Sequence, residues 1–206
     1  MDVKLTFINR TESPVNRDFV FFQKNLAAVF DDLAVVWKVI ADCGFDDRHP
    51  FSFPLAMGIG AQDSWGNPIG LGQLPAKCGE LFRVLERPSG SVIELVGPAS
   101  SPTQMQLRSD FTRGAVNAQI FRDGRRLAVN NLVPGQTAAF EFRPSLWVGA
   151  VTEMREGDLI NSAILSTIDT ELSLEGIASA DIVATGGGRG REWQPIRFDL
   201  ENVVRT

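Results

Sequence analysis

The chain of 206 residues is 44% hydrophobic and 22% charged, and its 20 basic and 25 acidic residues give a net charge of −5. This balance excludes a protein that coats nucleic acid or an anionic membrane, because such proteins need an excess of Lys and Arg. His49 is the single histidine and tyrosine is absent, which excludes metal sites built from several histidines and catalysis by a phenol.

The first third of the chain predicts strands. Residues 3–9 alternate apolar and polar side chains, with Val3, Leu5 and Phe7 on one face, as in a half-buried strand. Residues 19–23 are aromatic and β-branched and predict a second strand. Residues 26–41 also fit a helical period that ends before Gly44, but residues 33–40 are rich in types that lose side-chain freedom in a helix. We expect a strand over residues 33–40, and another over the alternating residues 51–61.

The rest of the chain predicts turns and short strands. Residues 62–79 hold many Gly and Pro positions and predict a long loop. Residues 81–85 and 92–96 predict one hairpin, and residues 115–121 and 126–129 flank Asp123-Gly124, a strong hairpin signal. Residues 133–136 predict a type II turn that leads into a strand over 137–142. Further strands are expected over residues 146–151, 163–174, 178–185 and 196–200.

Together these segments predict an all-β fold. About eleven strands without βαβ alternation bury their apolar faces most simply as two facing antiparallel sheets, a β-sandwich with at most one or two short helices. The pattern shows no gap for a linker, so the sequence predicts a single β-sandwich domain over residues 1–206.

Sequence features also predict the compartment and the redox state. The N-terminus lacks the basic and apolar regions of a secretory signal, which predicts a cytoplasmic protein, with export that uses no classical N-terminal signal as the alternative. The longest apolar stretch, residues 33–40, is interrupted by Lys38 and is far shorter than the roughly 20 residues that span a bilayer. Two cysteines in such a chain favour free thiols over a bridge between Cys43 and Cys78.

The acidic segment 42–50 is the best concentration of metal-ligating atoms. Calcium takes six to eight oxygens, and this segment offers the aspartates Asp42, Asp46 and Asp47, but without the alternating spacing of a calcium loop. Zinc prefers His and Cys, and Cys43 with His49 supplies two of the four ligands, with nothing nearby in the sequence to complete the set. We favour a solvated connector whose aspartates form local turns.

The remaining motifs are weaker. The glycine-rich segment 186–191 lacks the Gly-Lys-Ser/Thr of a phosphate loop and favours a flexible connection between strands. The chain has no Gly-x-Ser-x-Gly motif and only one imidazole, so no catalytic, cofactor-binding or metal-binding residue is predicted. Trp37 and Trp147 lie in apolar strands and predict core positions. Trp65 and Trp193 lie in loops, where an indole can stack on a sugar ring or contact a partner.

Two parts of the sequence resemble a known family. Residues 134–149 read PGQTAAFEFRPSLWVG and residues 155–162 read REGDLINS, and near the N-terminus FIN (7–9), FFQK (21–24) and LAVVW (33–37) follow one another. These short motifs resemble the rhizosphere-expressed, RhiA-like bacterial proteins. The resemblance implies an all-β protein, linked in some rhizobia to quorum-regulated expression near roots, and implies no catalytic residues. The chain departs from the family in its lack of tyrosine and in residues 42–114.

Three functions therefore compete. The first is a non-enzymatic β-sandwich, secreted or stored by a bacterium, that acts by self-association or by binding a protein partner. The second is a carbohydrate-binding module that uses Trp65 and Trp193, and the third is a metal- or carboxylate-dependent hydrolase with its site near residues 42–49.

Self-association, as a homo-oligomer without a cofactor, is the outcome that the strand composition favours. Residues 3–9, 19–23 and 146–151 carry almost no charge, and unguarded edge strands pair with other chains. We expect at least one of these three strands to lie at an edge; the alternative is that all three lie inside the sheets.

Overall fold

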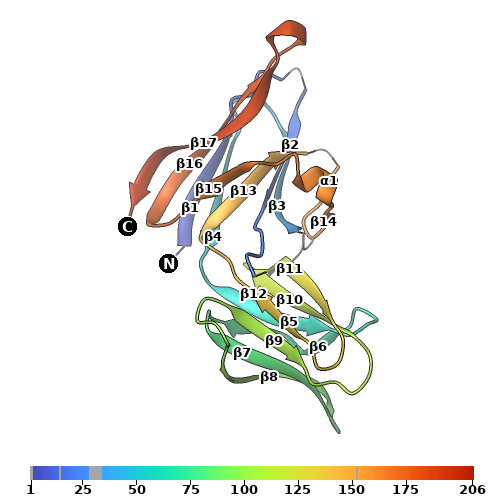
Figure 1. The fold of residues 1–206 in the computed structure, drawn as a ribbon. Helices are drawn as coiled ribbons and strands as arrows, with labels where there is room; N and C mark the ends of the chain where they lie inside the picture. Colours follow the sequence, from blue (N-terminus) through green and yellow to red (C-terminus); the bar gives the residue numbers. More distant parts are fainter. Residues whose placement is uncertain (1, 14, 28–33, 152) are drawn as a thin grey trace. The chain divides into compact units, whose positions relative to one another are not determined.

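The computed structural model describes residues 2–13, 15–27, 34–151 and 153–206. Within these ranges the chain forms 17 strands, one short α helix (α1, Ser162–Leu165) and one 3-10 turn (Gly190–Glu192), so the prediction of an all-β protein with few helices is confirmed. Figure 1 shows the strands in chain order. No helix in the described part of the chain is long and apolar enough to cross a membrane.

The chain divides into two compact units, each built from separated segments. Unit 1 comprises Met1–Gln23, Val36–Leu55 and Arg143–Thr206, and unit 2 comprises Lys24–Val35 and Ala56–Phe142. The sequence predicts one sandwich of two antiparallel sheets with about eleven strands, whereas the described strands form four sheets that include two parallel pairs. The chain passes from one unit to the other at four places, one of them inside the strand Ala34–Cys43, and none of them has the composition of a linker. The sequence therefore shows no boundary.

Unit 1 contains a four-stranded and a five-stranded sheet. The first has the order β17 (Gln194–Arg205), β16 (Ile177–Gly187), β1 (Asp2–Asn9) and β4 (Arg48–Pro54), with β1 parallel to β16. The second has the order β14 (Leu159–Ile160), β3 (Ala34–Cys43), β2 (Arg17–Phe22), β13 (Ser145–Ala150) and β15 (Thr170–Ser173). Both sheets appear in the upper part of Figure 1.

Aromatic side chains hold these two sheets face to face. The ring of Phe7 in β1 lies 4.6 Å from that of Phe19 in β2 and 5.6 Å from that of Phe21. Trp37 in β3 packs edge-on against Phe53 in β4 with ring centroids 5.6 Å apart. Offset and edge-on aromatic pairs add about 0.5–1.5 kcal/mol to the area that they bury. The alternation predicted for residues 3–9 is therefore the inner face of β1.

Unit 2 also contains two four-stranded sheets. One has the order β11 (Arg125–Leu132), β10 (Val116–Arg122), β5 (Met57–Gln62) and β6 (Pro68–Ala76). The other has the order β12 (Thr137–Phe140), β9 (Met105–Ser109), β7 (Glu80–Arg87) and β8 (Gly90–Pro98), with β7 parallel to β9. Ile59 and Ile120 from the first sheet and Val84, Leu107 and Phe140 from the second are fully buried.

Three strand predictions were wrong in detail. Residues 51–61 form two strands, β4 in unit 1 and β5 in unit 2. The predicted loop 62–79 contains strand β6, in which Gly70 and Gly72 have φ angles of 62° and 84° and interrupt the regular pattern. Residues 163–174 contain α1 and β15 rather than one strand. Strand β9 was not predicted.

Both hairpins, the turn at residues 133–136 and the strand over residues 34–40 are confirmed. Residues 28–33, where the helical alternative began, lie outside the described residues.

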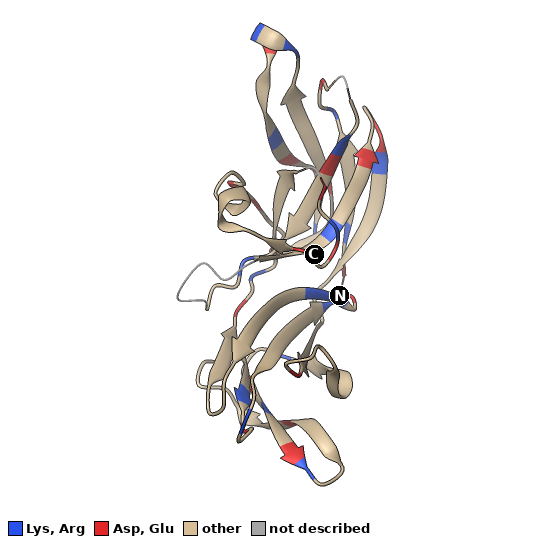
Figure 2. Ribbon diagram, turned by 90° about the vertical axis from the view of Figure 1, so that its right-hand side faces the viewer, with Lys and Arg blue, Asp and Glu red and all other residues tan. Residues whose placement is uncertain are grey.

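The strands that contain the three weakly charged segments, β1, β2 and β13, are all interior, so the expectation that one of them lies at an edge was wrong. β1 lies between β16 and β4, β2 between β3 and β13, and β13 between β2 and β15. The edges of unit 1 are instead β4, which carries Pro50 and Pro54, the short strands β14 and β15, and the charged strand β17. Proline, shortness and charge are the usual guards of edge strands. Figure 2 shows basic and acidic residues interspersed along the ribbon.

Candidate functional sites

The turn between β3 and β4 brings together three side chains that can bind a metal. Cys43 ends β3, Asp47 ends the turn, and His49 is the second residue of β4. The Cys43 thiol, an Asp47 carboxylate oxygen and a His49 ring nitrogen all lie within 4.8 Å of one another. Cys43 is buried, His49 is half-buried and Asp47 is exposed, so the group spans the distance from the core of unit 1 to solvent. The sequence named Cys43 and His49 as possible zinc ligands and Asp47 as a possible calcium ligand, and the structure places these three side chains together.

Asn9, a buried residue at the end of β1, fixes this turn. Its Nδ2 donates to the carbonyl oxygens of Cys43 at 2.9 Å and Gly44 at 3.0 Å. The backbone N–H of Asn9 donates to the Asp47 carbonyl at 3.2 Å, and its Oδ1 accepts from the Thr11 backbone and hydroxyl. Any other conformation of the turn would leave some of these buried donors and acceptors without partners, at a cost in free energy. The turn therefore has one strongly preferred conformation.

The electrostatics of the site favour the protonated thiol. Burial, reinforced by the nearby Asp47 carboxylate, raises the pKa of Cys43 to about 11, against a smaller opposing effect of the Asn9 hydrogen bond. A thiol with this pKa is a weak nucleophile at neutral pH, because the thiolate is the reactive form. The arrangement therefore does not favour a catalytic cysteine.

The other two aspartates of the acidic segment do not join this group: Asp42 lies in β3 and Asp46 lies in the turn. Asp42 Oδ1 accepts a hydrogen bond from Asn16 at 3.0 Å, and the Asp46 backbone N–H donates to the Asn9 carbonyl. Both aspartates have positive φ angles, 52° and 60°, a conformation that Asp tolerates better than most residues. The prediction of a local turn is thus confirmed for Asp46 and wrong for Asp42, which belongs to β3.

A second candidate site is a cavity of about 380 Å³ in unit 1. Its walls come from the start of β2, from β13 and β15, from the segment after α1, and from the start of β17. Trp193, which is 56% exposed, lines it together with Arg17, Asp169 and the two threonines Thr167 and Thr170. Apolar and polar groups are therefore mixed in one concave surface of the size that small ligands use, about 300–1,000 Å³.

Two details shape this cavity. Gly149 on β13 gives Ile168 room, since a Cβ at this position would lie 2.6 Å from Ile168 Cδ1. The Nε of Arg17 is shielded from solvent and has no hydrogen-bond partner among the described residues. Buried polar groups are otherwise almost always hydrogen-bonded, and this Nε has no exposed surface through which a ligand could reach it.

The other tryptophans lie elsewhere. Trp37 is fully buried, as predicted, and Trp147 is half-buried and stacks on Phe22 with ring centroids 6.3 Å apart. Trp65 is 88% exposed and belongs to unit 2. It lies in a turn where Asp63 Oδ1 accepts hydrogen bonds from the backbone of Trp65 and Asn67. The two loop tryptophans that the sequence paired therefore belong to different units.

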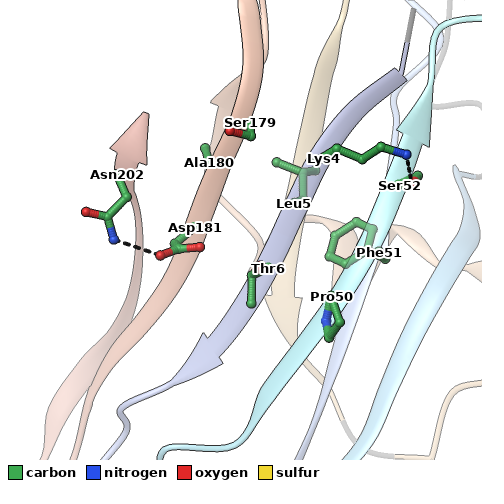
Figure 3. Close-up of a pocket in the computed structure, with 10 residues that line it drawn as sticks. All are labelled: Lys4, Leu5, Thr6, Pro50, Phe51, Ser52, Ser179, Ala180, Asp181 and Asn202. Atoms are coloured by element: carbon green, nitrogen blue, oxygen red, sulfur yellow. Dashed lines mark hydrogen bonds between the residues drawn. The ribbon is translucent and has the colours of Figure 1, made fainter. Parts of the chain in front are cut away.

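A third hollow lies over the four-stranded sheet of unit 1 and has a volume of about 500 Å³. Figure 3 shows polar side chains from β1, β4, β16 and β17 around it. Several of them already bind one another: Lys4 Nζ donates to Ser52 Oγ at 2.9 Å, and Asn202 Nδ2 donates to Asp181 Oδ2 at 2.8 Å. None of the exposed large apolar side chains lines it, so it offers a ligand fewer free groups than the Trp193 cavity.

The glycine-rich segment 186–191 makes close backbone contacts within unit 1. Gly186 has a φ of 90°, and a Cβ there would lie 2.3 Å from the Pro195 carbonyl oxygen. The Gly188 backbone N–H donates to the Glu12 carbonyl at 2.7 Å, and the Gly186 carbonyl accepts from Glu12. The first of these bonds uses a backbone N–H that an anion would need, and both connect the segment to residue 12, which supports the structural interpretation of the segment.

Comparisons with known proteins add no family or fold relative. No protein-family model matches the chain, and no curated protein or solved structure matches it either. Function is therefore inferred from the chemistry of the sites described above.

Proposed function

We propose that this protein is a non-enzymatic binding protein whose unit 1 binds a carbohydrate in the Trp193 cavity. The observation that carries the proposal is an exposed indole at a concave site that also contains Arg17 and Asp169. Sugar rings present an apolar face that stacks on an indole and a rim of hydroxyl groups that need hydrogen-bond partners. This cavity offers both kinds of contact.

The polar groups of the cavity suit hydroxyl recognition. The carboxylate of Asp169 accepts from Thr170 Oγ1 at 3.2 Å and keeps further acceptor positions for ligand hydroxyls. Arg17 lines the same cavity, and its guanidinium carries several N–H donors of the kind that hydroxyl oxygens accept from. Charged partners of this kind form hydrogen bonds about twice as strong as neutral ones.

The acid content of the cavity favours binding over hydrolysis. Glycoside hydrolases use a pair of carboxyl groups that flank the scissile bond. Asp169 is the one carboxylate among the residues that line this cavity. We therefore propose binding without cleavage of the sugar.

A glycan array followed by calorimetric titration with the best array hit tests this function. We expect Trp193→Ala to weaken binding at least tenfold, because one stacking contact contributes about 1.4 kcal/mol, a factor of ten in affinity. Trp65→Ala is the matched control, since it removes an exposed indole from unit 2, and should leave affinity unchanged. An array without hits, or unchanged affinity of the Trp193→Ala variant, would refute the proposal.

Self-association through β8 is a second proposed function. β8 is an edge strand of unit 2 with one charged residue, Glu94, and its Leu95 and Val96 are about half exposed. Exposed apolar residues on a weakly charged edge favour pairing with another chain. Light scattering coupled to size exclusion should show a dimer or larger assembly that Val96→Lys reduces. A 22.5 kDa monomer at high micromolar concentration would contradict this second function.

A further inference from the structure

We propose that Cys43, Asp47 and His49 of unit 1 bind one zinc ion. This site is separate from the Trp193 cavity and shares none of its lining residues. Thiolate sulfur, imidazole nitrogen and carboxylate oxygen are the three ligand types that zinc takes in proteins. Calcium and magnesium prefer sets made only of oxygen, so the mixture of atoms points to a transition metal.

The distances fit a site that closes around the ion. With bonds of about 2.0–2.3 Å, a tetrahedral zinc holds neighbouring ligand atoms about 3.3–3.8 Å apart. The three ligand atoms lie within 4.8 Å of one another. Closure therefore needs side-chain movements of about 1 Å, which the rotatable bonds of the exposed Asp47 allow.

An unpartnered ring nitrogen is the observation that favours an ion over a simple polar cluster. His49 Nε2 is shielded from solvent and has no hydrogen-bond partner among the described residues. The Cys43 thiol makes a long contact, with its sulfur 3.9 Å from the Gly44 carbonyl oxygen, and a hydrogen bond with Asn9. Buried polar atoms without partners often indicate an ion or water. A bound cation would be coordinated by the Cys43 sulfur and a ring nitrogen of His49 together.

The surrounding backbone holds the ligands in place without the metal. Asn9 binds the carbonyls of Cys43 and Gly44, and the Gly44 backbone N–H donates to Asp47 Oδ2 at 2.7 Å. On β4, His49 stands opposite Phe7 of β1, within the sheet of unit 1. Outer hydrogen bonds of this kind orient metal ligands and raise affinity.

Three protein ligands leave the fourth zinc position to water. Asp47 is exposed, so water can reach the ion from the side of this ligand. Thiolate and carboxylate together neutralise the double positive charge of the ion, and the thiol proton is released when the metal binds. We expect metal binding to stabilise the position of the β3–β4 turn relative to both sheets of unit 1.

Cobalt titration of the chelator-treated full chain tests the site. Cobalt(II) takes the place of zinc and reports thiolate ligation by a sulfur-to-cobalt charge-transfer band. We expect one cobalt per chain, an intense band and its loss when one equivalent of zinc is added. His49→Gln should weaken binding at least about tenfold, as expected for a damaged metal site.

The matched control compares the two cysteines. Cys43→Ser should abolish the charge-transfer band, while Cys78→Ser, in unit 2, should leave it unchanged. Circular dichroism checks that each variant is folded, and His49→Gln at a half-buried position tests the site without changing the buried cysteine. Absence of the band in the wild-type chain, or its persistence in Cys43→Ser, would overturn the proposal.

Discussion

Asn9 shows how one buried side chain can organise a loop. Its amide satisfies two carbonyls of the β3–β4 turn and both donors of Thr11, so the positions of Cys43 and Asp47 depend on it. The sequence identified Cys43, His49 and the aspartates as polar candidates but gave no role to Asn9. Its importance comes from contacts with residues more than thirty positions away, which no local pattern encodes.

Replacement of Asn9 should therefore destabilise unit 1. Asn9→Ala leaves buried carbonyl and hydroxyl groups without partners, at a cost of roughly 2–4 kcal/mol in the free energy of unfolding. Asn131→Ala is the control, because its exposed side chain makes one bond, to Asn117 at 2.9 Å, and should cost less than about 1 kcal/mol. Urea unfolding followed by circular dichroism measures both. Equal losses for the two variants would contradict the role of Asn9.

The two cysteines should differ in reactivity. Both are free thiols, Cys43 buried and Cys78 exposed, so an alkylating reagent should modify Cys78 first in the native, metal-free protein. Burial disfavours the Cys43 thiolate, and it should form only as pH rises from about 9 toward about 11. The contribution of the neutral thiol to stability is thus present below pH 9 and lost as pH rises through this range.

Mass spectrometry of alkylated peptides across pH checks this prediction. The Cys78→Ser variant leaves Cys43 as the one reactive cysteine. If Cys43 of the native protein were alkylated at pH 8 as fast as in urea, the predicted protection of Cys43 would be wrong.

Among whole elements, the hairpins were predictable and the strand boundaries were not. Asp123 and Gly124 have φ angles of 55° and 70°, which the Asp-Gly pair signals locally. The boundary between β4 and β5 is invisible in the sequence because the apolar alternation runs across it into another unit. The central positions of β1, β2 and β13 follow from pairing between distant segments, which composition alone cannot reveal.

The connection between β16 and β17 should depend on glycine at position 186. Gly186→Ala adds a Cβ 2.3 Å from the Pro195 carbonyl oxygen and requires a φ of 90°, so we expect a loss of roughly 3 kcal/mol or more in the free energy of unfolding. Gly114→Ala is the control, with a φ of 78° and no atom within 4 Å of the added Cβ, and should cost about 1 kcal/mol. Thermal unfolding of the two variants compares their stability. A loss of stability in Gly186→Ala no larger than that in Gly114→Ala would contradict the close contact between residue 186 and the Pro195 carbonyl oxygen.

For the whole molecule, the sequence predicted the all-β class because strand periodicity is a local property. It did not predict two units, because each unit assembles from segments that the other interrupts. The Trp193 cavity was predictable only in part: the exposed loop indole was expected, whereas Arg17 and Asp169 join it through the fold. The resemblance to RhiA-like proteins stays a prediction.

The central claim is that a carbohydrate binds beside Trp193, and nuclear magnetic resonance of the indole N–H groups tests it most directly. The chain has four tryptophans, and the signal that disappears in Trp193→Phe identifies Trp193. On addition of the best glycan from the array, we predict that this signal shifts with increasing ligand while the Trp65 signal does not. A Trp193 signal that stays unchanged at saturating glycan would contradict the account.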